Sequence, residues 1–282
     1  MALANRSQRQ SFLGADSDYT LSRTVVAIVG LCGGGSHVAP QLAHIGATNF
    51  RLFDPDHVDY SNLNRMLGST PTDAATGRSK TDVIREQILR INPSVTVELI
   101  AKKWQEEHTR LRDCTAVFGC VDSFEQRGEL EAYCRRFLIP YIDIGMDVEK
   151  LSERHYSISG QVILSLPGYP CMWCMGFLNK TRIAQEQERY GDAGDRPQVI
   201  WPNGLLASTA VGKFMGLITP WRKPQELVLF TEYDGNRHLM HPSRTLDHLA
   251  STQCRHYPLC DTGDPFFEVR EPMTPTTAAC EK

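Results

Sequence analysis

The sequence predicts an α/β fold with a doubly wound, mostly parallel sheet that is extended by antiparallel strands. Three observations support this prediction. A β-branched run at residues 24–29 ends in a glycine-rich turn that leads into apolar residues at helical spacing. Helical and extended patterns then alternate as far as residue 145, which is typical of a parallel sheet. From about residue 155 extended segments follow each other without a helix between them, which indicates antiparallel strands.

Composition argues against several classes of protein. The chain has 282 residues, a hydrophobic fraction of 41% and a formal net charge of -3 without long blocks of one sign, so a dedicated nucleic-acid or membrane surface is not expected. The polar start lacks the apolar core of a signal peptide, and no segment has the roughly 18 apolar residues of a membrane-spanning helix. We therefore expect a cytoplasmic protein. Its nine cysteines suit thiols or metal ligands better than a disulfide framework.

The elements of the first half follow in order. After the strand at 24–29, the turn at 30–35 leads into a helix with Val38, Leu42 and Ile45 on one face. A second strand over 50–53 ends in Asp54. Such a Rossmann-like sheet has its ligand crevice at the carboxyl ends of the strands. The remaining segments are predicted at 77–92 (helix), 95–101 (strand), 106–112 (short helix), 115–121 (strand), 123–137 (helix with Ser123 as N-cap) and 140–145 (strand).

The second half has a different pattern. Residues 156–166 predict an extended pair around Ser159 and Gly160, and residues 179–198 indicate a long, polar surface loop. Residues 203–218 are small and apolar, as in a buried helix, and a hairpin is expected over 227–241. We divide the chain into an N-terminal arm (1–22), one domain (23–262, with halves 23–150 and 151–262) and a proline- and threonine-rich tail (263–282).

The glycine turn predicts a nucleotide site. Gly30, Gly33 and Gly35 would bring backbone N–H groups and the positive end of the following helix to phosphate oxygens. Asp54 follows Gly30 by 24 residues, about where a nucleotide-binding fold places a carboxylate on the ribose hydroxyls. Cys32 stands at the second glycine position of this pattern, where a Cβ limits the approach of a diphosphate. An ordinary βα loop without a ligand remains the alternative.

Four polar residues beyond the turn suit a triphosphate. Asn62, Arg65 and Lys80 follow the second strand, and Asp122 ends a later one. Arginine and lysine would neutralise phosphate charge, and Asp122 could hold a Mg²⁺ ion that bridges the phosphate oxygens. Each alone is most often a surface charge. Their positions at strand ends of one sheet favour a shared site.

Two cysteine pairs predict a structural zinc site. Cys171 and Cys174 form a C-x-x-C pair, and Cys254 and Cys260 form a second pair about 80 residues later. The second spacing is longer than usual for zinc, and His256 could replace one thiolate. A redox pair and unrelated buried cysteines are the alternatives.

The motifs together resemble the ThiF/MoeB-like (HesA/MoeB/ThiF) superfamily, which adenylates the C-terminal carboxylate of ubiquitin-like proteins. The similarity covers nearly the whole chain: RSQRQ is similar to the arginine motif of the family, LFDPDHVDYSNLNR to its D-x-D and SNLxR signature, GRSKTDV and GCVDS to its lysine and aspartate motifs, and GQVILSLPGYPCMWC to the hairpin before its first zinc pair.

The resemblance implies a role for each matched residue. Asp54 would bind the ATP ribose, Asn62, Arg65 and Lys80 the phosphates, and Asp122 the magnesium ion and the reacting centre. The similarity of RSQRQ to the arginine motif of the family implies that Arg9 reaches the ATP site of a neighbouring protomer, and therefore a homodimer. The second zinc pair of the family corresponds to Cys254 and Cys260.

We therefore expect an enzyme that uses ATP, Mg²⁺ and Zn²⁺ to adenylate a ubiquitin-like or sulfur-carrier protein ending in glycine, for a downstream conjugating enzyme or sulfur donor. No cysteine lies between residues 175 and 253, so we expect no obligatory thioester on this chain. The alternatives are a nicotinamide-dependent oxidoreductase of Rossmann type and a nucleotide-binding scaffold without catalysis.

Overall fold

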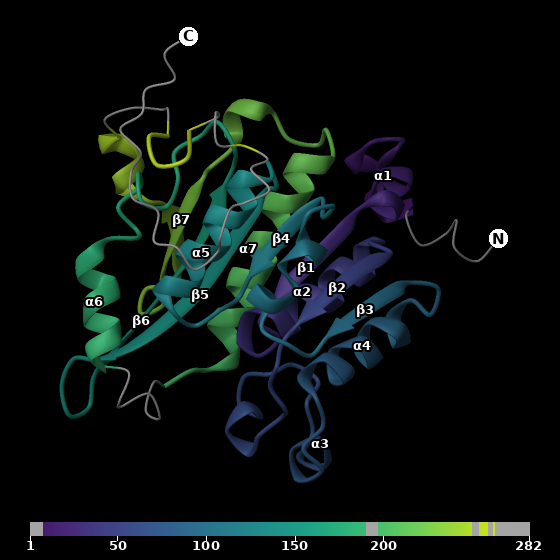
Figure 1. Ribbon diagram of the computed structural model, residues 1–282, viewed down its shortest axis with the longest axis horizontal. Helices are drawn as coiled ribbons and strands as arrows, with labels where there is room; N and C mark the ends of the chain where they lie inside the picture. Colours follow the sequence, from purple (N-terminus) through teal and green to yellow (C-terminus); the bar gives the residue numbers. More distant parts are fainter. Residues whose placement is uncertain (1–7, 190–196, 250–253, 259–261, 263–282) are drawn as a thin grey trace.

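The strands form one continuous sheet. The computed structural model describes residues 8–189, 197–249, 254–258 and 262, and within them the strand order is β3-β2-β1-β4-β5-β6-β7-β8 (Figure 1). The pairs from β3 to β5 are parallel and those from β5 to β8 antiparallel, which confirms the predicted sheet. The strands are β1 (Val25–Val29), β2 (Asn49–Phe53), β3 (Thr96–Ile100), β4 (Ala116–Gly119), β5 (Tyr141–Lys150), β6 (Tyr156–Ser165), β7 (Phe230–Asp234) and β8 (Leu239–Pro242).

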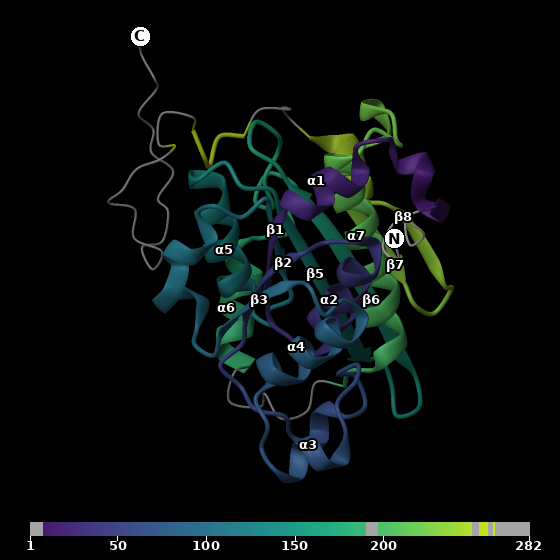
Figure 2. The same cartoon turned by 90° about the vertical axis from the view of Figure 1, so that its right-hand side faces the viewer.

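Helices cover both faces of this sheet (Figure 2). Val26 and Ile28 of β1 belong to the core under α2, α4 and α7, whereas Ala27 and Val29 belong to the core under α5. Alternate residues of a strand face opposite sides of the sheet. Because helices cover both faces here, the residues on each face of a strand must be apolar. The longer helices are α2 (Gly33–Ile45), α4 (Lys80–Ile91), α5 (Phe124–Arg136), α6 (Lys180–Arg189) and α7 (Ile200–Ile218).

Short helical segments complete the chain. The described part of the predicted N-terminal arm is folded, with Leu13 and Leu21 buried. No helix in the described ranges is both long and apolar enough to cross a membrane. The short elements are η1 (Gln8–Leu13), α1 (Ser17–Arg23), η2 (Tyr60–Asn62), α3 (Pro71–Ala75), η3 (Trp104–Leu111), η5 (Pro224–Glu226) and η6 (Arg244–His248).

Two predictions for the second half are wrong. Residues 156–165 form the single strand β6 and not a pair with a turn at Gly160. Gly160 is needed for a different reason, because a Cβ there would lie 2.6 Å from Leu206 of α7. The predicted loop at 179–198 contains the helix α6, whose polar sequence carries no apolar stripe to signal it.

Candidate functional site

The glycine turn joins β1 to α2 at the carboxyl end of the strand. Gly30 has φ +88°, a left-handed conformation that favours glycine, and an added Cβ would overlap the backbone of Cys120 after β4. A Cβ on Gly35 would overlap the carbonyl oxygen of Gly30. Gly33 lies close to α7, since a Cβ added to it would lie 2.8 Å from the side-chain amide of Asn203. The three glycines therefore bring α2, β4 and α7 together at one point.

The start of α2 has the features of an anion site. Its N-cap residue, Cys32, makes no side-chain capping hydrogen bond. The first N–H groups of a helix have no partner within the helix, and the helix dipole adds positive potential there. A phosphate at this position would accept hydrogen bonds from the uncapped N–H groups.

Asp54 ties the end of β2 to the glycine turn. The side chain is 5% exposed, and its two oxygens accept hydrogen bonds from Leu31 N (2.7 Å) and Asp56 N (2.9 Å). Lys80 Nζ lies 3.9 Å from Asp54 Oδ1 and 2.8 Å from Asp56 Oδ2. Burial raises the pKa of Asp54, and the Lys80 charge opposes this shift. Each carboxylate oxygen keeps a further lone pair that ribose hydroxyls can use.

Arg65 has a buried donor without an acceptor. Its Nη1 donates to Ser61 O (2.6 Å) and to Asn64 Oδ1 (3.2 Å), but its Nε is buried and has no hydrogen-bond partner in the described part of the chain. Leaving such a donor unpaired costs about 1–3 kcal/mol, which a phosphate oxygen would recover. Asn62, in contrast, is buried and uses Oδ1 to accept from Asp59 N (3.1 Å), so it also shapes the loop that carries Arg65.

The charged residues predicted from the sequence converge on the Cys32 thiol. Burial raises the pKa of this thiol, the positive charges of Arg65 and Lys80 lower it, and the negative charges of Asp122 and Asp54 raise it. All four charges therefore act on one point at the turn. Asp122 is exposed, and its carboxylate makes no hydrogen bond or ion pair with any described residue.

Arg9 lies at the other end of the molecule. Its segment η1 contacts the chain beyond the C-terminus of α7, where the Phe12 and Trp221 rings are 6.4 Å apart. The glycine turn contacts Asn203 near the N-terminus of that helix. In both views α1 and α3 lie at opposite ends of the molecule (Figures 1 and 2). Of the predicted catalytic residues, Arg9 is therefore not brought to the site of its own chain.

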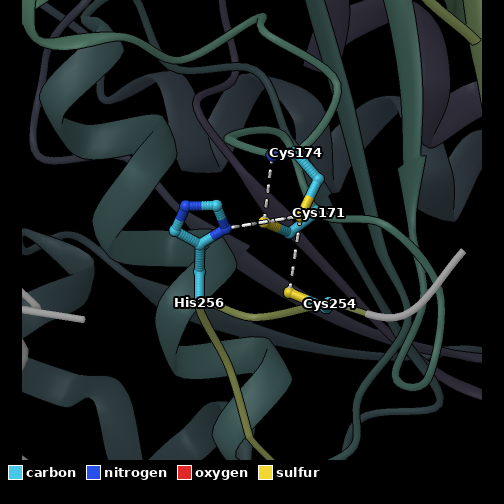
Figure 3. A group of neighbouring side chains, drawn as sticks. All are labelled: Cys171, Cys174, Cys254 and His256. Atoms are coloured by element: carbon cyan, nitrogen blue, oxygen red, sulfur yellow. Dashed lines mark hydrogen bonds between the residues drawn. The ribbon is translucent and has the colours of Figure 1, made fainter. Parts of the chain in front are cut away.

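Three of the four predicted zinc ligands come together, with a histidine beside them. Cys171, Cys174, Cys254 and His256 have their ligand atoms within 4.8 Å of one another (Figure 3). The Sγ atoms of Cys171 and Cys174 are 3.6 Å apart, those of Cys174 and Cys254 are 3.9 Å apart, and His256 Nδ1 lies 3.3 Å from Cys174 Sγ. Tetrahedral zinc with Zn–S of about 2.3 Å and Zn–N of about 2.0 Å requires edges of about 3.5–3.8 Å. Cys260 lies outside the described residues.

A buried carboxylate, that of Glu131, connects the two segments that form this cluster. Glu131 of α5 accepts hydrogen bonds from Met172 N (2.8 Å), Ser165 Oγ (2.5 Å) and Tyr257 OH (3.4 Å). Burial raises the pKa of Glu131 to about 7. One side chain thus links α5, β6 and both segments that supply the cysteines and the histidine.

Several residues near the site were missed by sequence reasoning. Arg127 Nη1 donates to Asp143 Oδ1 (2.7 Å) and Oδ2 (2.6 Å), which forms a buried ion pair. Asp143 Oδ1 also accepts a hydrogen bond from Tyr141 OH (2.9 Å). A lone aspartate inside an apolar strand was the available signal, because a buried carboxylate needs a partner. Asn203 is likewise the single polar residue at the start of the apolar α7 segment.

The comparisons with known proteins agree on one family. Residues 5–255 match the model of the ThiF family. tRNA threonylcarbamoyladenosine dehydratase of Haemophilus influenzae is 33% identical over 135 residues, which cover 46% of this chain and 50% of that protein. Ubiquitin-like modifier-activating enzyme 5 of Rattus norvegicus is 32% identical over 171 residues (55% and 40%), and molybdopterin-synthase adenylyltransferase of Escherichia coli is 28% identical over 167 residues (58% and 63%). The chain thus spans about half the length of these curated relatives.

Solved structures show the same fold. Escherichia coli MccB with ATP has a TM-score of 0.70 at 22% identity, covering 85% of this chain and 71% of that one. The microcin C7 biosynthetic enzyme MccB in complex with N-formylated MccA has a TM-score of 0.72 at 21% identity, covering 85% and 72%. At this level of identity the likeness is one of fold.

Proposed function

The chain belongs to the ThiF family, and we propose on this premise that it adenylates the C-terminal carboxylate of a ubiquitin-like or sulfur-carrier protein. In this reaction the carboxylate attacks the α-phosphorus of ATP, the acyl–phosphate bond forms, and pyrophosphate leaves. A carboxylate is already a competent nucleophile, so the protein has mainly to hold the reactants in line and neutralise phosphate charge.

The observation that carries this proposal is the group of charges at the glycine turn: Asp54 accepts a hydrogen bond from the turn, Lys80 Nζ lies 3.9 Å from Asp54 Oδ1, and the charges of Arg65 and Asp122 act on the pKa of the Cys32 thiol. Two cations and an uncapped helix start suit a triphosphate, and the unpaired Arg65 Nε offers a further donor to it. A nicotinamide-dependent oxidoreductase would explain Asp54 and the glycines but not this set of charges.

The residues fit two metal ions with different tasks. Asp122 would hold magnesium, since its carboxylate is exposed and makes no hydrogen bond or ion pair among the described residues. The ion would supply charge neutralisation at the phosphate oxygens. Cys171, Cys174, Cys254 and His256 would hold zinc, which has a structural role because four protein ligands leave no open position.

The position of Arg9 supports a homodimer. If Arg9 takes part in adenylation, a second copy must supply it, because the arm lies at the opposite end of α7 from the glycine turn of its own chain. Each site would then contain Asp54, Arg65, Lys80 and Asp122 from one chain and Arg9 from its partner.

We further propose that the acyl-adenylate passes directly to an external nucleophile, without an obligatory thioester. Burial raises the pKa of Cys32, Cys120 and Cys134, and that of Cys114 to about 11, so these thiols are poor nucleophiles. The test is incubation with ATP and the carboxylate partner, followed by a denaturing gel with and without reductant. A reductant-sensitive adduct that one cysteine substitution removes would overturn this step.

Pyrophosphate exchange into ATP tests the function itself. Because relatives are named for a ubiquitin-like modifier, a molybdopterin synthase and a tRNA base, the substrates should include a ubiquitin-like protein ending in glycine, a sulfur-carrier protein and tRNA. Exchange that requires the ubiquitin-like protein is expected. Exchange only with another substrate would refute the proposed partner, ATP binding without any exchange would favour the scaffold, and reduction by NADH would favour the oxidoreductase.

A further inference from the structure

Among the residues that the structure describes, the carboxylate of Asp122 has no partner, although it lies beside the start of a helix. Asp122 immediately precedes Ser123, the N-cap residue of α5. The first N–H groups of a helix attract carboxylates, both as hydrogen-bond donors and through the helix dipole. Asp122 nevertheless accepts no hydrogen bond from the described residues.

Two side chains take the donors at the start of α5. Ser123 Oγ accepts from Gln126 N (3.1 Å), which is an ordinary N-cap. The first helical N–H, that of Phe124, donates instead to Glu186 Oε2 at 2.7 Å. Glu186 comes from α6, is 6% exposed, and places a negative charge at the positive end of α5.

Further contacts hold α6 in place for this hydrogen bond. The Arg182 guanidinium lies 6.0 Å from the centre of the Phe124 ring, and its Nη1 donates to Phe177 O (3.1 Å). The rings of Phe124 and Phe177 are 5.5 Å apart. Helix α6 lies beside α5 in both overall views (Figures 1 and 2). These contacts of Arg182, one turn before Glu186 in α6, help to hold the Glu186 carboxylate at the start of α5.

We propose that Glu186 is a positioning residue for Asp122: by occupying the Phe124 N–H, it keeps the Asp122 carboxylate available to the cation that accompanies ATP. This inference rests on the proposed function. Without Glu186, the vacated N–H is open to the carboxylate of Asp122, since an aspartate side chain can accept a hydrogen bond from the backbone N–H two residues further along the chain. Asp122 would then cap α5, and its carboxylate would no longer be available to bind the cation.

Two variants and a matched control test this role. Glu186→Ala removes the acceptor, Glu186→Gln keeps an acceptor oxygen of the same shape, and Glu125→Ala removes an exposed charge from the same helical turn without touching the Phe124 N–H. In Glu186→Ala we expect kcat for pyrophosphate exchange to fall and the half-saturating Mg²⁺ concentration to rise, each about tenfold, as for outer-shell partners of metal ligands. KM for ATP should change less than twofold. Glu186→Gln should restore most of the loss.

A readout that does not depend on turnover separates this proposal from the proposed function. In a crystal structure of Glu186→Ala, the Asp122 carboxylate should lie within hydrogen-bond distance of Phe124 N. If wild-type protein shows no exchange but this rearrangement occurs, the function fails and the positioning role stands. The role is refuted if Asp122 does not move, if Glu186→Gln is as impaired as Glu186→Ala, or if Glu125→Ala gives the same change in Mg²⁺ dependence. Thermal melting of all variants identifies a loss that is only one of folding.

Discussion

Mixing two inactive variants tests whether each site is shared between two copies of the chain. Arg9→Ala removes the group expected from the partner, and Asp122→Ala removes the cation ligand of the same site. The arm contacts Trp221 beyond the C-terminus of α7, whereas the glycine turn contacts Asn203 near its N-terminus. Helix α7 has 19 residues and is about 28 Å long at about 1.5 Å per residue. An arginine side chain cannot span that distance within one chain.

The expected recovery follows from the symmetry of a dimer. Each variant alone should be inactive in pyrophosphate exchange, because every site lacks one group. After subunit exchange in an equimolar mixture, half of the dimers contain one chain of each kind, and one of the two sites in such a dimer is complete. Activity should therefore return to roughly one quarter of the wild-type value per chain.

A second mixture is the control. Arg65 and Asp122 belong to the same chain's half of the site, so mixing Arg65→Ala with Asp122→Ala leaves every site incomplete and should restore nothing. Native mass spectrometry establishes that mixed dimers have formed. Mixed dimers of Arg9→Ala and Asp122→Ala that stay inactive would show that the site is self-contained or that Arg9 has no role, and recovery in both mixtures would refute the assignment of groups to chains.

Three further predictions concern single residues. Arg65→Ala should lose about 3 kcal/mol of transition-state stabilisation, about 100-fold in kcat for pyrophosphate exchange, and an unchanged kcat would contradict its role. Purified protein should contain one zinc per chain by elemental analysis; His256→Ala should lose the metal and Cys260→Ala should keep it, while the reverse would restore the four-cysteine site. Lys213 is 5% exposed, and burial lowers its pKa to about 8, so between pH 8 and 10.5 the unfolded state binds the proton that the native state has released. The free energy of unfolding relative to Lys213→Met should then rise by about 3 kcal/mol over this interval, as measured by urea denaturation, and a constant difference would refute the shift.

The parallel half of the fold could be predicted because its signals are local. Each strand is a short apolar run, each helix has an apolar face, and Ser123 caps the helix that it was expected to cap. The failures are tertiary in origin. Gly160 has the composition of a turn but serves the packing of Leu206, and α6 is held by polar contacts such as that of Glu186 with Phe124 N, which no apolar periodicity reports.

The site could be predicted where chain position fixes spatial position. Strand ends meet at one edge of a parallel sheet, so Asp54 and Asp122 were expected to lie near the same turn. Spacing gives no such guidance for the metal cluster. The sequence allows either His256 or Cys260 as the fourth ligand. The path of the chain past Cys171 and Cys174 places His256 beside them. The ion pair of Arg127 with Asp143 joins a helix and a strand that local patterns do not relate.

The glycine turn shows why a side chain is tolerated at the second position of the nucleotide pattern. Gly30 has φ +88° and Gly35 has no room for a Cβ, so the backbone itself requires glycine at both. Cys32 has φ -84°, outside the left-handed region that favours glycine. Its Cβ narrows the space for phosphate on one side, while the N–H groups of the glycines that follow it, which the Cys32 side chain does not cap, still provide donors.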